Sequence, residues 1–298
     1  TWNVKRLRPA EFTQYDYTQE NYTQLLWFFE GFTSYYDDLL LRRAGLIDDA
    51  TYLKLLGKTI NQVMQTPGQA VQSVAQASFD AWTKYYRIDE NTPNATVSYY
   101  TKGALLALCF DLSLRDPRGG LVPSHLDAVM RGLWRRCKAG PLCEADFCAV
   151  LSEVGQRSFA AEVAAWVQGT GVLPLQPLLQ AHGVAVICEP AALAQQLGLR
   201  VSETAGTVVL KNVLRGSPAE RAGMAAGDEW LGVDNWRLHR LDDLPLYAGA
   251  ERSVTALVAR DQRLLHLKLQ LPEPQATQSW RLAVQDAARV GAWLAATH

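Results

Sequence analysis

The sequence predicts an α+β protein in which a long helical region is followed by a shorter β-rich region and a terminal helix. Up to about residue 167, apolar residues recur three and four positions apart, which is the spacing of amphipathic helices. After Gly169 prolines cluster, and short β-rich runs such as residues 207–210 follow. Helical spacing returns over residues 279–296. We therefore expect domains at residues 1–178, 179–275 and 276–298.

Seven helices are predicted in the first region, and two of them carry clear start signals. Thr66 offers a cap that is followed by Pro67 at the first helical position, and Ser124 opens a Ser-x-x-Asp sequence. The first region is therefore expected to form an α-helical domain. The predicted helices cover residues 22–41, 49–63, 67–79, 98–114, 124–134, 144–154 and 159–167.

Composition excludes several classes of protein. With 298 residues, of which 48% are hydrophobic, the chain can fill two ordinary cores. The 29 lysines and arginines nearly balance the 30 aspartates and glutamates, so no overall field favours nucleic acid or an anionic membrane. The longest apolar stretches, such as residues 104–110, fall far short of the roughly 20 residues that span a bilayer. We expect neither a nucleic-acid nor a membrane partner.

The cysteines indicate the redox compartment. Their number is odd and no Cys-x-x-Cys pair occurs, which favours reduced thiols over a disulfide framework and predicts a cytoplasmic protein. The chain opens at Thr1 without an initiator methionine or a signal segment, so we expect the true N-terminus to be missing. The five cysteines are Cys109, Cys137, Cys143, Cys148 and Cys188.

A single carboxylate, Glu30, lies in an aromatic helical run. Its neighbours three and four positions away are Leu26, Trp27, Thr33 and Ser34, so no local cation can neutralise it. An ionised carboxylate buried without a partner costs several kcal/mol or shifts its pKa. Glu30 therefore needs a distant arginine, a hydrogen-bond network or a metal, and the residues alone leave a structural ion pair and a ligand role open.

The surrounding motif resembles a known signature. Trp27-x-x-Glu30-Gly31-Phe32-Thr33 resembles the W-x-x-E-G-[FL]-[AT] motif of gluzincin aminopeptidases, and residues 1–9 resemble the segment that follows His-Glu-x-x-His in the glycyl aminopeptidase family, peptidase family M61. The resemblance implies a thermolysin-like helical subdomain in which Glu30 is the third zinc ligand. It also implies that two histidines and a general-base glutamate precede Thr1, outside this chain.

The histidines of the chain do not replace that motif. No two of them lie four positions apart beside a glutamate, so each is expected to be a surface or structural residue. Zinc is therefore the expected cofactor of the parent protein, whereas this chain alone is expected to be metal-free and inactive. The five histidines are His125, His182, His239, His266 and His298.

A second motif opens the predicted helix 98–114. Tyr100-Thr101-Lys102-Gly103 is similar to the Y-x-K-G element of the same aminopeptidases, which implies that the hydroxyl of Tyr100 donates to the oxyanion of the tetrahedral intermediate. One such donor is typically worth about 2.7–4 kcal/mol. The alternative is a tyrosine that only packs at a helix start, and Tyr99 is expected to be such a neighbour.

The β-rich region carries a specific turn pattern. Ser217 can cap a short helix that starts with Pro218, and Gly223 can adopt the left-handed conformation that ends it. This run resembles the S-P-A-x-x-A-G-[LM]-x-x-G-D core of PDZ domains and implies a PDZ fold over roughly residues 180–273.

Upstream of that core, Leu197, Gly198, Leu199 and Arg200 resemble the PDZ loop that receives a peptide C-terminus. The helix that should line the peptide groove, residues 241–247, is short and contains a proline. We therefore favour packing of this domain against the helical one, with a C-terminal peptide as the other possible partner.

Together the motifs predict the C-terminal portion of a zinc-dependent aminopeptidase. The resemblance implies peptide substrates from which small N-terminal residues, glycine or alanine, are hydrolysed. The alternative is a noncatalytic, PDZ-containing peptide-binding or scaffold protein. The two differ in whether His-Glu-x-x-His precedes Thr1.

Overall fold

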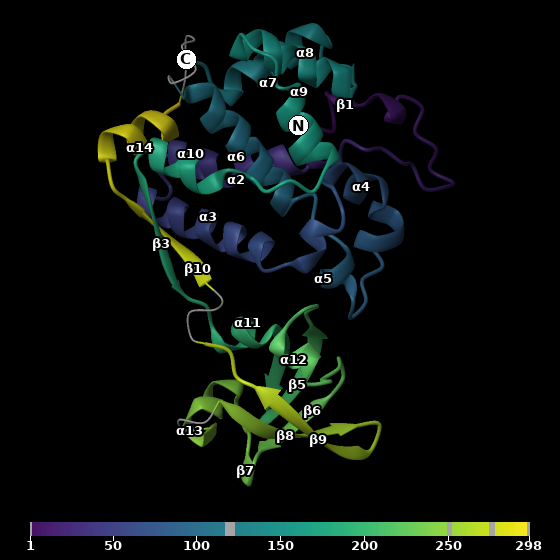
Figure 1. The fold of residues 1–298 in the computed structure, drawn as a ribbon. Coiled ribbons are helices and arrows are strands. Elements are labelled where there is room, and N and C mark those ends of the chain that lie inside the picture. The colour runs from purple at the N-terminus through teal and green to yellow at the C-terminus, as the bar shows by residue number, and fades with distance from the viewer. Residues whose placement is uncertain (1, 117–122, 249–251, 274–277, 297–298) are drawn as a thin grey trace.

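The fold is known from a computed structural model that describes residues 2–116, 123–248, 252–273 and 278–296. Two hydrophobic cores divide the molecule into a helical part and a β-rich part, which Figure 1 shows one above the other. We call them the large domain, residues 2–190 together with 278–296, and the small domain, residues 191–273. The protein is α+β, as the sequence predicted.

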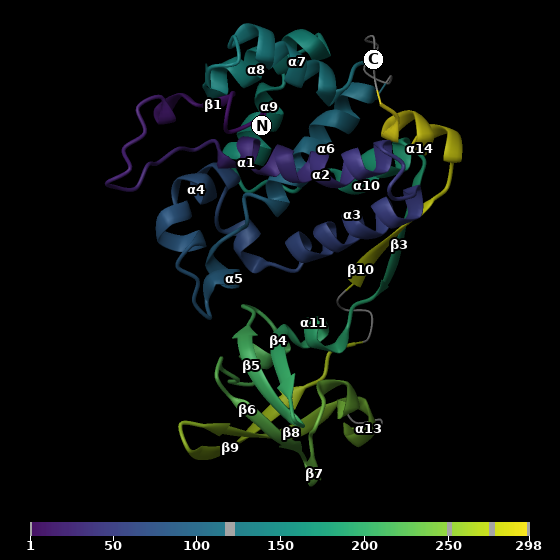
Figure 2. The ribbon, with the colours of Figure 1, turned by 180° about the vertical axis from the view of Figure 1, so that it is seen from behind.

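Helix α6 is the centre of the large domain. It is hydrophobic on all sides, and every residue from Leu105 to Leu112 is buried because other helices surround it. Helix α2 packs along it, and α3 and α10 also contact it (Figure 2). The elements up to the small domain are β1 (Arg8–Pro9), η1 (Ala10–Phe12), α1 (Leu26–Phe29), α2 (Gly31–Arg43), α3 (Asp49–Met64), η2 (Pro67–Ala70), α4 (Val74–Phe79), η3 (Ala81–Tyr85), α5 (Thr92–Ala95), α6 (Thr101–Arg115), α7 (Leu126–Arg136), β2 (Pro141–Leu142), α8 (Glu144–Gly155), α9 (Ala160–Glu162), η5 (Val163–Gln168), α10 (Leu175–Ala181) and β3 (Val184–Pro190).

Local capping explains where two predicted helices differ from the observed ones. The predicted helix 67–79 is split because Ser73 and Gln76 form a reciprocal capping box that starts α4 anew. The predicted cap Ser124 lies one residue too early, since His125 is the observed N-cap of α7 and its Nδ1 accepts a hydrogen bond from the Ala128 amide at 3.2 Å. Both differences are shifts within a helical region that the sequence located.

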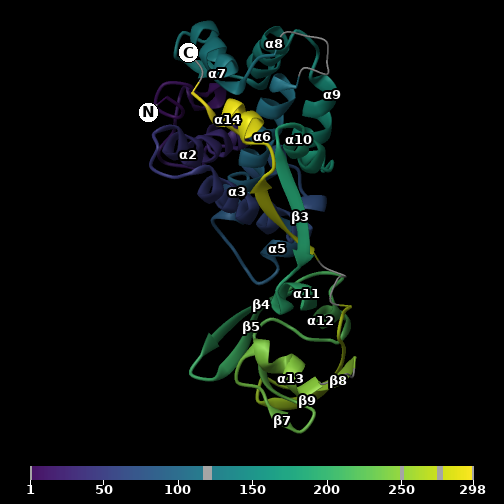
Figure 3. The same ribbon diagram turned by 90° about the vertical axis from the view of Figure 1, so that its left-hand side faces the viewer.

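The end of the chain corrects a prediction. A helix was expected over residues 279–296, but residues 278–284 form the strand β10 (Gln278–Val284), which pairs antiparallel with β3. Only α14 (Ala287–Leu294) is helical, and Asp286 caps it by accepting from the amides of Ala288 and Arg289. The strand forms because β3 supplies a partner from far away in the sequence. Figure 3 shows this two-stranded ribbon running from the large domain to the small one.

In the sequence, the small domain lies between β3 and β10, the two strands that pair with each other. Val184 of β3, Leu282 of β10 and Trp293 of α14 all belong to the core of the large domain. Leu178, the predicted end of the first domain, lies inside α10 and in that same core. By core membership, the small domain is therefore an insertion between β3 and β10.

The small domain is an antiparallel sheet with short helices at its edges. The strand order is β4-β5-β6-β8-β9, with β7 paired to β6. The predicted turn chemistry is present: Ser217 Oγ accepts from the Glu220 amide at 3.1 Å, and Gly223 has a φ of 84°. The elements are α11 (Leu193–Leu197), β4 (Leu199–Thr204), β5 (Thr207–Val213), α12 (Pro218–Arg221), β6 (Glu229–Val233), β7 (Trp236–Arg237), η6 (Leu241–Asp243), α13 (Leu244–Ala248), β8 (Ser253–Arg260) and β9 (Arg263–Gln270).

Two whole-chain expectations can be compared with the described residues. None of the helices in that part of the chain has the length and apolar character to cross a bilayer. All five cysteines are free thiols.

Candidate functional site

Glu30 occupies the junction between α1 and α2. Its amide bonds to the Leu26 carbonyl at 2.8 Å and its carbonyl accepts from the Ser34 amide at 2.8 Å, so helical bonding continues through it. Its side chain faces a cavity of about 440 Å³ between these helices and the N-terminal segment. The lining residues are Val4, Arg8, Pro9, Phe12, Tyr15, Tyr17, Leu26, Phe29 and Glu30.

The carboxylate of Glu30 has no hydrogen bond or ion pair with any residue that the structure describes. Burial raises its pKa, and the negative charge of Asp37 raises it further. The arginine partner that a structural ion pair requires is therefore not among the described residues. Glu30 is thus a half-buried carboxylate that lines a cavity and has no partner among the described residues.

Tyr100 lies directly before α6 and within the electrostatic reach of Glu30. Burial raises the pKa of its hydroxyl most, and the charge of Glu30 is the next cause. Tyr99 is fully buried, and its pKa is raised by burial and by the neighbouring tyrosines. Tyr100 is not among the described residues that line the Glu30 cavity. What relates the two side chains is the effect of the Glu30 charge on the pKa of Tyr100.

The glycines of the two motifs explain this proximity. A Cβ added to Gly31 would lie 2.5 Å from Gly103 Cα, and one added to Gly103 would lie 2.6 Å from the Trp27 carbonyl oxygen. The backbones of α2 and α6 therefore touch where Glu30 precedes one helix and Tyr100 precedes the other. Only glycine on both sides permits this approach, which brings the backbone at Glu30 close to the backbone that follows Tyr100.

Sequence reasoning missed the tyrosines that pack around Tyr100. The ring of Tyr85 lies 5.6 Å from that of Tyr100 and 4.8 Å from that of Tyr99, and the charge of Tyr86 contributes to the pKa of Tyr100. Tyr85 ends η3, a π-helical turn of the kind that often occurs at functional sites. The repeated Tyr-Tyr pairs at 85–86 and 99–100 were the available signal.

Lys102, in the same motif as Tyr100, has a different place. It is 1% exposed, and its Nζ donates to the Gln69 carbonyl at 3.3 Å. Burial lowers its pKa. Because residues two apart on a helix face opposite sides, Lys102 points away from Tyr100 and connects α6 to η2.

The residues present fit one zinc ligand rather than a complete site. Among the described residues, no group of three histidine, cysteine, aspartate or glutamate side chains could hold a metal. Of the histidines, His125 caps α7, the Nδ1 of His182 lies 2.9 Å from the Leu178 carbonyl, and His239 and His266 lie in the small domain. His298 and Thr1 lie outside the described residues.

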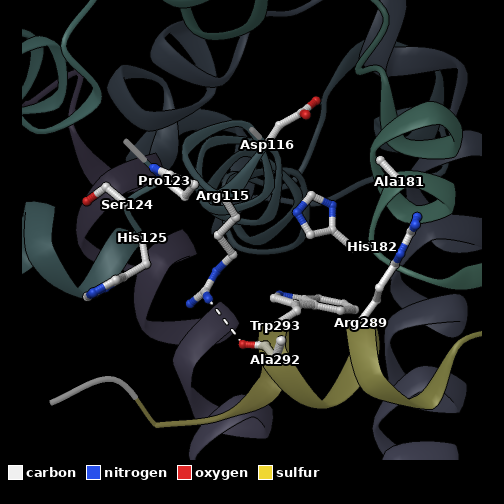
Figure 4. Close-up of a pocket in the computed structure, with 10 residues that line it drawn as sticks. All are labelled: Arg115, Asp116, Pro123, Ser124, His125, Ala181, His182, Arg289, Ala292 and Trp293. Carbon is white, nitrogen blue, oxygen red and sulfur yellow. Dashed lines mark hydrogen bonds between the residues drawn. The ribbon is translucent and has the colours of Figure 1, made fainter. Parts of the chain in front are cut away.

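A separate cavity of about 640 Å³ lies between α6, α10 and α14 (Figure 4). His125 and His182 both line it, and Arg115 Nη1 donates to the Ala292 carbonyl at 3.4 Å across it. The described residues that line it do not include any that line the Glu30 cavity.

The loop that resembles a carboxylate-binding loop faces the large domain. Gly198, Leu199 and Arg200 line a groove of about 1180 Å³ between the domains, opposite Gln65 and Gln69. The Nη2 of Arg200 lies 3.4 Å from Thr66 Oγ1 across this groove. Leu197, the first residue of the loop, is buried in the small-domain core.

Comparison with known proteins finds a family match within the large domain. A family model described as M61 glycyl aminopeptidase matches residues 1–106, which contain Glu30 and Tyr100. No curated protein matches the chain.

Among solved structures, an aminopeptidase N family protein from Idiomarina loihiensis is similar at 32% identity with a TM-score of 0.88. The match covers 99% of this chain and 53% of that one, so the chain spans about half the length of this relative. A shorter match to an HtrA-type protease with a decapeptide covers 27% of this chain and 30% of that one, at 20% identity. Its TM-score is 0.23.

Proposed function

Because the chain belongs to the M61 glycyl aminopeptidase family, whose model matches residues 1–106, we propose that it is the C-terminal portion of a zinc-dependent aminopeptidase. The proposed substrates are peptides with a small N-terminal residue, glycine or alanine. One observation carries the proposal: Glu30, a half-buried carboxylate without a partner among the described residues, lies beside Tyr100 and faces a cavity. We also propose a cytoplasmic location, which the five free thiols support because they suit a reducing compartment.

Glu30 would hold zinc together with histidines that precede Thr1 in the complete protein. Its carboxylate needs no rearrangement to do so, since no described residue occupies its lone pairs. Zinc, when bound, polarises the scissile carbonyl and lowers the pKa of the attacking water. Glu30 would supply the one anionic ligand, from the junction between α1 and α2.

Tyr100 would donate its hydroxyl proton in a hydrogen bond to the oxyanion. Burial and the Glu30 charge raise its pKa, so the hydroxyl stays protonated and remains a donor at neutral pH. The ring contacts with Tyr85 and Tyr99 restrict its orientation before substrate binds.

Replacement of Tyr100 by phenylalanine tests the proposal. In the protein encoded by the complete coding sequence, Tyr100→Phe should lower kcat for a glycyl-anilide about 10²–10³-fold, with zinc content unchanged. Tyr22→Phe is the control and should retain near-normal kcat, because Tyr22 is exposed and its ring contacts Phe79. Near-normal turnover of Tyr100→Phe would remove Tyr100 from the mechanism.

The 298-residue chain by itself offers a second test. Zinc sites require at least three protein ligands, and a carboxylate alone binds zinc weakly. We therefore expect the isolated chain to retain no zinc after dialysis and to hydrolyse no glycyl-anilide. Stoichiometric zinc together with turnover would show that the metal ligands are misassigned.

The groove between the domains favours a second candidate, a noncatalytic PDZ-containing peptide-binding protein. Lys58, Arg200 and Arg215 line the groove, and no described lining residue is acidic, which suits a peptide carboxylate. The PDZ loop formed by Leu197, Gly198, Leu199 and Arg200 would then receive the peptide C-terminus. Submicromolar binding of a peptide with a free C-terminus, lost on amidation, in a complete protein without peptidase activity would favour this candidate.

A further inference from the structure

One asparagine joins the two domains through both ends of its side chain. Asn94, in α5, is 6% exposed. Its Nδ2 donates to the Val213 carbonyl at 2.9 Å, and its Oδ1 accepts from the Arg215 amide at 2.8 Å. The large domain thus binds the small-domain backbone at the point where β5 ends. Neither group can be satisfied by water without opening the interface, because the amide is buried.

The backbone that follows Asn94 is held at successive positions. Gly68 lies so close to Thr96 that an added Cβ would be 2.0 Å from the Thr96 carbonyl oxygen. The Val97 amide donates to Gln72 Oε1 at 3.2 Å, and Ser98 Oγ accepts from the Thr101 amide at 3.3 Å. The segment 94–100 is therefore held at Thr96 against η2, at Val97 against Gln72, and at Ser98 against the first turn of α6.

Tyr100 ends this fixed segment, six residues after Asn94. Two residues later, Lys102 connects α6 to the Gln69 carbonyl of η2. Tyr100 consequently lies between an anchor on the small domain and an anchor on η2. Asn94 and Tyr100 therefore belong to one continuous segment whose intervening residues are held by close contacts.

Oxyanion stabilisation is sensitive to displacement of the hydrogen-bond donor. A hydrogen-bond donor must lie about 2.7–3.1 Å from the developing oxyanion, and a misplacement of about 1 Å can cost about 100-fold in rate.

We propose that Asn94 is a positioning residue for Tyr100, so that docking of the small domain completes the oxyanion site of the large one. The inference rests on the proposed function, since it assigns the small domain a part in that same site. It predicts that the contact between the domains affects the chemical step, although no described residue of the small domain lines the cavity of Glu30.

Asn94→Ala and Asn94→Asp in the complete protein test the proposal. Ala removes both interdomain hydrogen bonds, whereas Asp keeps the acceptor for Arg215 and loses the donor to Val213. We expect kcat to fall about 10–100-fold for Ala, with KM for a glycyl-anilide and zinc content unchanged. Asn212→Ala is the control, because Asn212 donates an exposed interdomain bond to the Glu90 carbonyl at 2.9 Å, outside the fixed segment. It should keep kcat within about two-fold of the parent.

A double-mutant cycle separates positioning from general destabilisation. In a Tyr100→Phe background, Asn94→Ala should lower kcat less than about two-fold, because the positioned hydroxyl is already absent. An equal loss in both backgrounds, or an unchanged kcat for both Asn94 variants, would overturn the proposal.

A spectroscopic readout does not depend on catalysis. With 3-fluorotyrosine at position 100, Asn94→Asp should shift and broaden the ¹⁹F resonance, and Asn212→Ala should not. An unchanged resonance in a folded Asn94→Asp protein refutes the positioning role. If the resonance shifts but the parent protein has no peptidase activity, the proposed function fails while the positioning of Tyr100 by Asn94 stands.

Discussion

At the scale of single residues, two carboxylates that are partly or fully removed from solvent differ in whether an arginine pairs with them. Asp228 in the small domain is fully buried, and Arg260 pairs with it bidentately at 2.7 and 2.8 Å. Glu30 is half-buried, yet none of the described residues pairs with it. This contrast among the described residues supports the proposal that Glu30 binds an external ligand.

Glu30→Gln should therefore stabilise the metal-free protein at neutral pH. The folded state raises the pKa of Glu30, so between the ordinary carboxyl pKa of about 4.3 and the raised value it binds more protons than the unfolded state. The stability contributed by this group is thus lost as pH rises through that window. Melting curves should show little difference between the variant and the parent near pH 4, and a higher Tm for Glu30→Gln at pH 7.

The exposed residue Glu20 provides the control for that experiment. Glu20→Gln should leave the pH dependence of Tm unchanged, because this side chain has no hydrogen bond or ion pair with the described residues. A Glu30→Gln protein that melts lower than the parent at pH 7 would indicate a stabilising partner and would argue against the free carboxylate.

At the scale of secondary-structure elements, the crossing of α2 and α6 sets the geometry of the candidate site. The crossing occurs backbone to backbone at Gly31 and Gly103. Helices that meet through larger side chains lie 8–10 Å apart, so glycine at the crossing brings the residues before each helix closer than ordinary packing allows. Glu30 and Tyr100 are those residues.

Gly103→Ala should destabilise the protein although alanine is the better helix former. The new Cβ would lie 2.6 Å from the Trp27 carbonyl oxygen and 2.9 Å from Gly31 Cα, so the helices must separate. We expect a loss of about 1–3 kcal/mol in urea denaturation. Catalytic activity of the complete protein should fall as well.

Gly291→Ala in α14 is the matched control. A Cβ at Gly291 meets no atom within 4 Å, so the substitution should stabilise by about 0.5–1 kcal/mol through helix propensity alone. If Gly103→Ala were as stable as the parent, the backbone contact would not determine the distance between the helices.

At the scale of the whole molecule, the small domain is connected by a two-stranded ribbon. One strand, β3, precedes the domain in the sequence and the other, β10, follows it. Asn61 in α3 fixes that ribbon: its Nδ2 donates to the Trp280 carbonyl at 2.8 Å and its Oδ1 accepts from the Trp280 amide at 2.7 Å. The chain after β10 then returns α14 to the core, where Trp293 is buried. The orientation of the small domain therefore depends on contacts made within the large one.

Asn61→Ala should loosen the ribbon without unfolding either domain. Loss of the two hydrogen bonds should cost about 1–3 kcal/mol and expose the amides of β10 to exchange. Hydrogen exchange measured by mass spectrometry should show faster exchange in residues 278–284, and Gln62→Ala, an exposed neighbour on the same helix, should not. Unchanged exchange in Asn61→Ala would mean that pairing with β3 alone holds the strand.

The sequence by itself determined the features that depend on neighbours a few residues apart. Helical spacing located the helices of the large domain, and the Ser217, Pro218 and Gly223 turn is present as expected. The absence of a local cation identified Glu30 as an unusual carboxylate, and the motifs led to the M61 family. The roles of Glu30, Tyr100 and the loop 197–200 stay predictions.

Tertiary structure decided the features whose partners are remote in the chain. Strand β10 exists because β3 pairs with it, and Asn61 meets Trp280 across 219 positions of sequence. The contact of Gly31 with Gly103 and the hydrogen bond from Asn94 to Val213 likewise join residues that are remote in the sequence. Spacing and turn chemistry act within one or two helical turns, whereas strand pairing and interdomain hydrogen bonds form only when folding brings distant segments together, so no local pattern records them.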